Sequence, residues 1–198
     1  MLLLLNNRKK KTDHLSYVQK IKDALEIMKI PYYETNKVEV LPSHIKTKIR
    51  GIIISGSSMI LSSPNLPYEK YAFNIHYLRE FPDVPVYGIC FGCQILAIIY
   101  GYELKHGKMF CEKTNVLSRH KLFSGLPENH PFQFCFTDLI LPQKKSSEIS
   151  WFTFRDGNKY PCAFEFEKGK IFGSLFHPEF FEDTYKVLHN FAKITKSV

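Results

Sequence analysis

Three short stretches of the chain are apolar at every position, and they constrain the fold more than any other feature of the sequence. They are Leu2–Leu5, Gly51–Ile54 and Pro85–Ile89. A strand with one face in water alternates apolar and polar residues, whereas a strand between two layers of helices is apolar throughout. The stretches therefore predict central strands of a parallel sheet that is covered on both faces.

Helical patterns lie between and after these strands. One amphipathic face, ended by Pro31, has apolar residues at spacings of three and four: Leu15, Val18, Ile21, Leu25 and Met28. Further helices are expected at residues 68–81, 91–100 and 184–193. Strand and helix in alternation predict an α/β fold with helices on both faces of the sheet.

From about Met109 the pattern changes to shorter alternating pieces. We expect antiparallel strands at Phe132–Phe136, Thr153–Phe154, Ala163–Phe166 and Lys170–Phe176. The sheet is then mixed and mainly parallel. No repeat or linker is present, so residues 1–198 are expected to form a single domain.

Composition excludes several classes of protein. No apolar stretch approaches the ~18 residues of a membrane helix, and Leu2–Leu5 is shorter than the ~7–15-residue apolar core of a signal peptide. Five cysteines are an odd number in a chain that needs no disulfide staples, which favours a reducing, cytoplasmic location. We expect no membrane association.

Charge and motif spacing argue against nucleic acid, metal and nucleotide binding. The net charge is +8, but the basic run Arg8–Lys11 has no interleaved aromatic residues and is interpreted as a solvated loop. The histidines and cysteines have no zinc-site spacing, and no phosphate-binding G-x-x-x-x-G-K-[ST] loop is present. We therefore expect no metal and no cofactor.

The stretch Gly88-Ile89-Cys90-Phe91-Gly92 places a cysteine between two glycines where a strand gives way to a helix. In such a nucleophile elbow the reactive residue occupies a strained turn, and side chains at the glycine positions would collide with the neighbouring strand and helix. The helix N-terminus favours a thiolate, and the Phe91 N–H can face an oxyanion. A buried structural cysteine, or a Cys90-x-x-Cys93 redox pair, would be compatible with the same spacing.

A second motif, Phe176-His177-Pro178-Glu179, comes just before the last predicted helix. A histidine there can take the proton of a thiol, and a carboxylate two residues later can orient the imidazole and stabilise its charge. Alone, the two residues would more often be a loop histidine and a helix-capping carboxylate. With Cys90 they complete a Cys-His-Glu arrangement.

These segments together resemble the class I glutamine amidotransferase family. GICFGCQ matches the family's G-[IV]-C-x-G-x-Q, FHPE matches its F-H-P-E, and GIIISGSS resembles its oxyanion loop G-[IL]-[IL]-x-S-G-G-P. KLFSGLPENH resembles a segment common in the GMP synthase branch. The resemblance runs from about Leu2 to Phe191 and implies a flavodoxin-like fold with the site at the carboxyl edge of the sheet.

The resemblance also assigns roles to individual residues. It makes Cys90 the nucleophile, His177 the acid and base, and Glu179 the residue that orients His177. Gln94 takes a position at which family members contact bound glutamine, and the second oxyanion donor becomes the N–H of Ser57, which follows Gly56.

Two segments depart from the family pattern. The family's G-G-P is Gly56-Ser57-Ser58, so a positive φ at the second position would displace the loop. The family's S-H-G-D, which helps to hold the α-amino and carboxylate groups of the substrate, is Cys135-Phe136-Thr137-Asp138. Only the aspartate is kept.

The resemblance implies an enzyme that hydrolyses L-glutamine to glutamate and ammonia through a cysteinyl thioester. It further implies that the ammonia is supplied to a separate ATP-dependent synthase, similar to GMP synthase, in purine nucleotide biosynthesis. Two other functions remain open. One is hydrolysis of γ-glutamyl peptides, and the other is a non-catalytic binding or regulatory role on the same fold.

Overall fold

The computed structural model describes residues 1–8, 17–66, 69, 71–117, 119–143 and 147–196. The strands are β1 (Leu2–Leu5), β2 (Tyr32–Thr35), β3 (Gly51–Ile54), β4 (Val86–Ile89), β5 (Leu104–Phe110), β6 (Lys113–Leu117), β7 (Asn129–Phe134), β8 (Phe136–Ile140), β9 (Glu148–Thr153), β10 (Lys159–Glu167), β11 (Ile171–Ser174) and β12 (Phe176–His177). The helices are α1 (Tyr17–Ile27), α2 (Ser43–Lys46), α3 (Ala72–Glu80), α4 (Phe91–Ile99) and α5 (Tyr185–Ile194), with a short 3₁₀ helix, η2, at Lys121–Phe123.

The described strands form one large mixed sheet and one small sheet. The large sheet has the order β12-β7-β6-β9-β10-β11-β4-β3-β1-β2, and β5 pairs separately with β8. From β2 to β11 neighbouring strands are parallel, and β10 joins β11 in the antiparallel direction. The order β2-β1-β3-β4-β11 is that of flavodoxin-like folds, which bind ligands at the carboxyl ends of their strands. The predicted fold class is confirmed.

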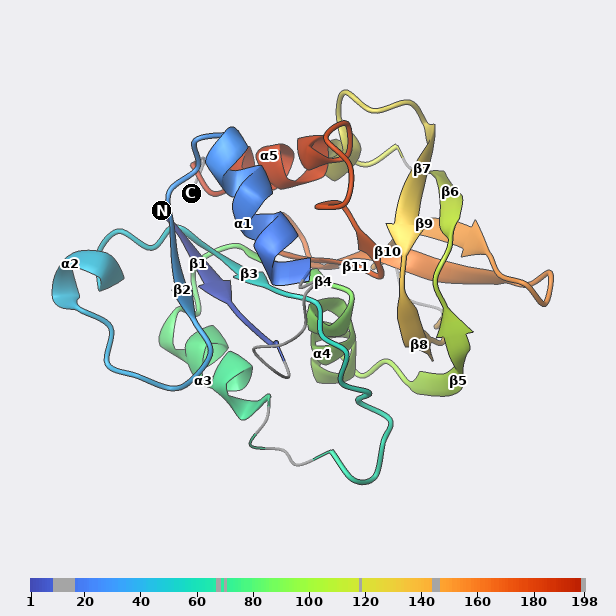
Figure 1. Ribbon diagram of the computed structural model, residues 1–198, viewed down its shortest axis with the longest axis horizontal. Coiled ribbons are helices and arrows are strands. Elements are labelled where there is room, and N and C mark those ends of the chain that lie inside the picture. The colour runs from blue at the N-terminus through green and yellow to red at the C-terminus, as the bar shows by residue number, and fades with distance from the viewer. Residues whose placement is uncertain (9–16, 67–68, 70, 118, 144–146, 197–198) are drawn as a thin grey trace.

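Helices cover both faces of the parallel half (Figure 1), with α1 and α5 on one side and α3 and α4 on the other. Tyr87 of β4 packs against Phe191 of α5, and its neighbour Gly88 contacts α4, because successive residues of a strand face opposite layers. The predicted apolar face of α1 is buried at Val18, Ile21 and Leu25. Leu15, the basic residues 9–11 and Tyr68 lie outside the described residues.

Two expected strands are each divided into two. Phe132–Phe136 is not one strand, because the chain breaks at Cys135 and its two parts, β7 and β8, belong to different sheets. Lys170–Phe176 is likewise divided into β11 and β12 at Leu175. Apolar residues continue through both breaks, so periodicity gave no sign of them. The sequence also gave no prediction of α2, β5 or β6.

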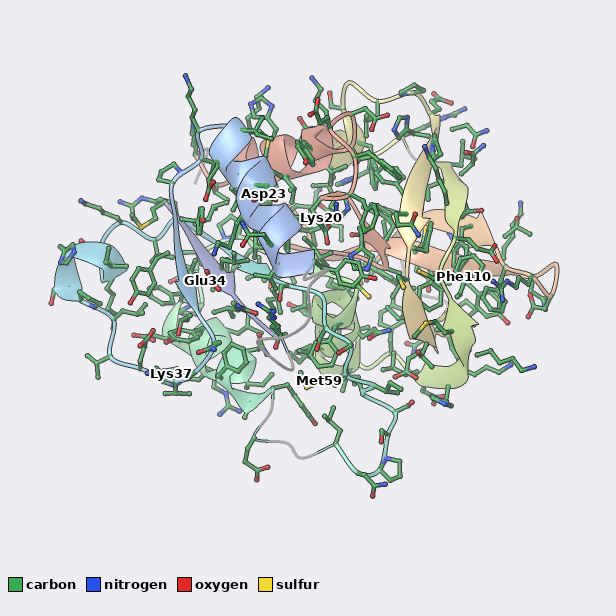
Figure 2. The ribbon with its side chains drawn as sticks, in the orientation of Figure 1. Lys20, Asp23, Glu34, Lys37, Met59 and Phe110 are labelled. Carbon is green, nitrogen blue, oxygen red and sulfur yellow. The ribbon has the colours of Figure 1, made fainter. Side chains whose placement is uncertain are left out.

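Aromatic side chains fill the space between the small sheet and the antiparallel part of the large one. Phe110 lies within 6.0 Å of Phe134 and Phe136 and 5.8 Å of Phe152, measured between ring centroids. Figure 2 shows Phe110 on this side of the molecule, among the antiparallel strands. The cluster fixes the position of β8. Cys135, the residue before β8, thereby lies beside Cys90 at the end of β4.

The two glycines of the elbow, Gly88 and Gly92, are closely packed against neighbouring backbone. A Cβ on Gly88 would lie 2.6 Å from the Gly92 carbonyl, and a Cβ on Gly92 would overlap the carbonyl oxygen of Ile54. We expect Gly92→Ala to lower the free energy of unfolding by about 3 kcal/mol or more, because neither backbone can move away. Urea unfolding measures the change.

Gly107→Ala is the matched control, since a Cβ there would meet only the Thr137 carbonyl, at an ordinary 3.5 Å. We expect it to change stability by less than about 0.5 kcal/mol. Equal stabilities of the two variants would refute the close-packing explanation.

Candidate active site

Cys90 lies in the tight turn between β4 and α4, at the carboxyl edge of the parallel strands. Its backbone has φ 51° and ψ −104°, a strained conformation for a residue with a side chain. Its N–H donates to the carbonyl of Ser174 (2.7 Å), and its Sγ donates to the carbonyl of Cys135 (3.3 Å). Phe91 begins α4, so its N–H has no partner within the helix. The chain turns here as the glycine spacing predicts.

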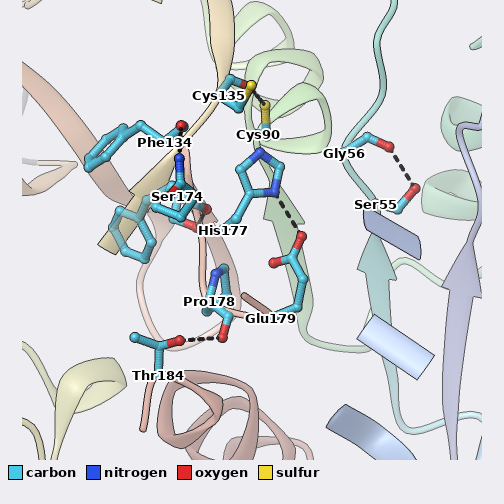
Figure 3. Close-up of polar contacts among 12 residues, drawn as sticks. Ser55, Gly56, Cys90, Phe134, Cys135, Ser174, His177, Pro178, Glu179 and Thr184 are labelled. Atoms are coloured by element: carbon cyan, nitrogen blue, oxygen red, sulfur yellow. Dashed lines mark hydrogen bonds and ion pairs between the residues drawn. The ribbon is translucent and has the colours of Figure 1, made fainter. Parts of the chain in front are cut away.

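His177 and Glu179 meet at the end of β12. His177 Nδ1 and Glu179 Oε1 are 2.7 Å apart, and both side chains are buried. A carboxylate can only accept a hydrogen bond, so His177 Nδ1 carries a proton and donates it to Glu179. The other ring nitrogen, Nε2, is then the one that can take up or give a proton. Nε2 is buried without a hydrogen-bond partner among the described residues. Figure 3 shows the imidazole between Cys90 and Glu179, with one ring nitrogen facing each.

The surroundings of His177 favour its charged form. Burial lowers the pKa of His177, but the charges of Glu179 and of a Cys90 thiolate outweigh burial and hold that pKa well above 6.5. The thiolate is the nucleophilic form of cysteine, and His177 lies beside Cys90 as the group that can hold the thiol proton. The arrangement is therefore suited to attack on an electrophilic carbon.

Ser174 and Thr184 hold this arrangement in place, and sequence reasoning missed both. Besides accepting from Cys90 N–H, Ser174 donates through its hydroxyl to the carbonyl of Phe176 (3.0 Å), the residue before His177. Thr184 donates to the carbonyl of Pro178 (2.7 Å), between His177 and Glu179. A single serine thus connects the turn at Cys90 with the strand that carries His177.

The loop after β3 brings Gly56 and Ser57 to the same place. A Cβ on Gly56 would lie 3.1 Å from His177 Cε1 and 3.6 Å from Cys90 Cβ, so a side chain there would press on both. Among the described residues only Lys29 and Cys90 combine a side chain with a positive φ, and Ser57 is not one of them. Serine therefore occupies the position of the family's second glycine without backbone strain.

A buried polar network fixes the start of this loop. The Asn7 N–H donates to Ser55 Oγ (2.9 Å), and Asn7 exchanges side-chain hydrogen bonds with Asn74 of α3 (3.2 and 2.7 Å). Asn7 directly follows the β1 region, so the network joins the carboxyl ends of two parallel strands. Two isolated asparagines carry no motif, and the sequence did not single them out.

A cavity of about 130 Å³ opens beside Cys90. Four predicted substrate-binding or oxyanion residues line it: Ser57, Gln94, Cys135 and Phe136. Gln94 is buried, and its Nε2 donates to the Asp138 backbone carbonyl (2.7 Å), which ties α4 to β8.

The Asp138 carboxylate makes internal contacts. It accepts from Ser62 N (2.9 Å) and Ser62 Oγ (2.6 Å), and it lies 3.0 Å from His106 Nδ1. Its side chain is 1% exposed. The aspartate retained from the family segment thus anchors the loop that follows Ser57.

Tyr17, the first residue of α1, is a further site residue that sequence reasoning missed. Its ring stacks on His177, with centroids 4.1 Å apart and planes inclined by 20°. Burial, together with a hydrogen bond to the Cys135 side chain, raises the pKa of Tyr17 far above its usual value. Topology could have found it, because a helix that follows a parallel strand begins at the same sheet edge as the nucleophile.

Other expected features can be placed as well. Cys93 is buried, with its sulfur toward Gly173 of β11, whereas Cys90 lines the cavity. Across the described ranges, no three His, Cys, Asp or Glu side chains are grouped to hold a metal ion. In the same ranges no helix is both long enough and apolar enough to cross a membrane.

The chain resembles known proteins both in sequence and in fold. The family model for "Glutamine amidotransferase class-I" matches residues 11–195. A subunit of the glutamine-hydrolyzing GMP synthase of Methanococcus aeolicus is 28% identical over 208 aligned residues, covering 98% of this chain and 97% of that protein. The GMP synthase of Staphylococcus epidermidis is 28% identical over 167 residues, 82% of this chain but 31% of that protein. The chain thus spans about a third of the longer relatives that it matches.

Solved structures share the fold. A protein of Thermoplasma acidophilum described as a GMP synthase subunit superposes with a TM-score of 0.74 at 20% identity, covering 99% of this chain and 94% of that one. The structure of PurLQS from Thermotoga maritima gives 0.70 at 18% identity, covering 97% and 96%. At these identities the likeness concerns the fold alone.

Proposed function

The chain belongs to the class I glutamine amidotransferase family, and from that premise we propose that it hydrolyses L-glutamine to glutamate and ammonia. We further propose that residues 1–198 act as one amidotransferase domain. One observation carries the proposal. A buried imidazole, oriented by Glu179, faces Cys90 at a strained turn that opens into a small cavity.

The proposed reaction is an acyl transfer in two halves. The Cys90 thiolate adds to the side-chain amide carbon of glutamine, and the backbone N–H groups of Phe91 and Ser57 stabilise the oxyanion. His177 gives the proton from Nε2 to the leaving nitrogen, so ammonia departs and a γ-glutamyl thioester remains. Water, deprotonated by the same nitrogen, then releases glutamate and restores the thiolate.

The cavity fits a small substrate. Its volume of about 130 Å³ is below the ~300 Å³ at the lower end of pockets for drug-sized ligands. Gln94, Cys135 and Phe136 would surround the glutamine, and backbone groups of residues 135–136 would replace side-chain contacts that the family makes there. A nucleotide would need another site.

We propose that the ammonia passes to a separate ATP-dependent synthase, similar to GMP synthase, in cytoplasmic purine nucleotide biosynthesis. Support comes from the Methanococcus aeolicus relative, which is named as one subunit of a GMP synthase and matches this chain over nearly its whole length. The longer relatives have about two thirds of their length beyond the aligned region.

One observation favours a second candidate function, the hydrolysis of γ-glutamyl peptides. Phe136 replaces the family's histidine, and the Asp138 carboxylate is occupied by Ser62 and His106. Fewer side chains are then available to hold the free α-amino and carboxylate groups of glutamine. A non-catalytic role is disfavoured, because the backbone strain at Cys90 would serve no purpose in a binding protein.

The test is alkylation by 6-diazo-5-oxonorleucine, a glutamine analogue that reacts with the nucleophile. We expect one adduct per chain, located at Cys90 by mass spectrometry, and protection by excess glutamine. This readout needs no partner synthase. Protection by γ-glutamyl dipeptides but not by glutamine would support the peptide substrate instead, and absence of the adduct while Cys90 still reacts with iodoacetamide would contradict both.

A further inference from the structure

Two cysteines that the proposed reaction does not use as nucleophiles lie opposite each other at the rim of the site. Phe110 pairs with Phe136, and Lys113 pairs with Gln133, in antiparallel register. The register is the same on both sides, so Cys111 stands directly across from Cys135.

The hydrogen-bond pattern brings these two side chains close together. Glu112 and Phe134 exchange both backbone hydrogen bonds (3.1 and 2.9 Å), which makes them a hydrogen-bonded pair. The next pair along an antiparallel ladder is the non-hydrogen-bonded kind, with Cα atoms ~4.5 Å apart. A disulfide spans Cα separations of about 4.4–6.8 Å. The strand register therefore brings the side chains of Cys111 and Cys135 within reach of each other.

We propose that Cys111 and Cys135 form a reversible disulfide that lowers the reactivity of Cys90. A peroxide would oxidise the Cys111 thiolate to a sulfenic acid and leave as water. Attack by the Cys135 thiol on that sulfur would form the S–S bond and release a second water. Two thiols and one peroxide thus give one disulfide and two waters.

Accessibility and chemistry are consistent with this pairing. Cys111 is exposed and Cys135 is partly exposed, while Cys93 and Cys162 are buried in the core. Partial desolvation of its sulfur, with the neighbouring Cys135, raises the pKa of Cys111 to about 11. Peroxide therefore reacts with the small fraction of Cys111 that is thiolate, and oxidation quickens as the pH rises towards that pKa. The reduced pair gains no stability from a thiolate, and an exposed disulfide is of the labile, regulatory kind.

The disulfide would act on the site through Cys135. The Cys135 carbonyl accepts from Cys90 Sγ, and the Cys135 side chain contacts Tyr17, which stacks on His177. Figure 3 shows Cys135 directly beside Cys90. The disulfide commits the Cys135 sulfur to Cys111 and removes its contact with Tyr17, so the ring that stacks on His177 loses support. A misplacement of ~1 Å in a catalytic group can cost ~10²-fold in rate.

Mass spectrometry of the full chain tests the pairing without any need for glutaminase activity. Trypsin separates the cysteines onto peptides 109–113 (Cys111), 122–144 (Cys135), 160–168 (Cys162) and 80–105 (Cys90 and Cys93). After limited hydrogen peroxide and capping of free thiols, we expect peptide 109–113 linked to peptide 122–144, with the link lost after dithiothreitol. Linkage of Cys135 to the Cys90 peptide, or no linkage, would overturn the proposal.

The rate of Cys90 alkylation by iodoacetamide reports the effect on the site. We expect it to fall by roughly 10²-fold in the oxidised protein and to recover with dithiothreitol. Cys111→Ser is the matched control, and we expect it to keep the alkylation rate of the reduced wild type after the same treatment. A similar loss in Cys111→Ser would mean that peroxide oxidises Cys90 itself, and an unchanged rate in the linked wild type would equally refute control of the site. Failure of the proposed glutaminase function would appear separately, as loss of labelling by the glutamine analogue in the reduced protein.

Discussion

Replacing Cys90 with alanine is expected to abolish glutamine hydrolysis, with a loss of roughly 10⁶-fold, as when the nucleophile of a serine protease triad is removed. The cysteines nearest to Cys90 are placed differently. Cys93 is buried with its sulfur toward β11, and Cys135 offers its backbone carbonyl to Cys90. Glutamate release, and alkylation by 6-diazo-5-oxonorleucine, should both disappear.

Cys93→Ala is the matched control, because it removes the same chemical group from the first turn of the same helix. We expect it to retain activity within a few-fold of the wild type. A Cys90→Ala protein that still takes up the glutamine analogue would show that the nucleophile lies elsewhere.

Substitutions at position 90 should also change the free energy of unfolding. Cys90 has φ 51°, and a residue with a Cβ pays about 1–2 kcal/mol for left-handed backbone, whereas glycine does not. Cys90→Gly should therefore be inactive but at least as stable as Cys90→Ala, despite the flexibility that glycine adds to the unfolded chain. Urea unfolding of the two variants measures the difference.

The sequence could predict this turn because its constraints are local. Gly88, Cys90 and Gly92 fall within one five-residue stretch, and a Cβ on Gly88 would collide with Gly92 of the same stretch. A Cβ on Gly92 would collide with Ile54 of β3, but the glycine spacing alone is enough to recognise the turn. The apolar strands were equally predictable, because burial on both faces leaves a pattern within a single short strand. Spacing and burial patterns of this kind can be recognised without knowledge of the distant chain.

What the sequence could not predict depends on contacts between distant segments. Tyr17 is stacked on His177, near the other end of the chain, and Asn7 meets Asn74 across the sheet edge. The break at Cys135 leaves no trace in the alternation of phenylalanines, yet it presents a carbonyl to Cys90. These features depend on which strands lie side by side. The pairing of β11 with β4, for example, is what brings the end of the chain to the turn at Cys90.

Glu179→Gln should have the next largest effect on catalysis, a loss on the order of 10²- to 10⁴-fold. The upper figure is the cost of the matching aspartate-to-asparagine change in a serine protease triad. Glutamine can keep a hydrogen bond to His177 Nδ1 but removes the negative charge. Burial of the imidazole then acts against only the charge of Cys90, so the pKa of His177 must fall.

The direction of that change fixes the pH dependence. In the wild type the raised pKa of His177 keeps Nε2 protonated above pH 6.5, so the acid that expels ammonia is present at neutral pH. In Glu179→Gln the alkaline limb of the kcat/KM profile should move to lower pH, because His177 loses its proton earlier. Glu182→Gln, which removes an exposed carboxylate three residues away, should leave the limb in place. A uniform loss of rate with an unmoved limb would mean that Glu179 acts only by holding the ring, whereas a displaced limb identifies its charge as the source of the protonated histidine.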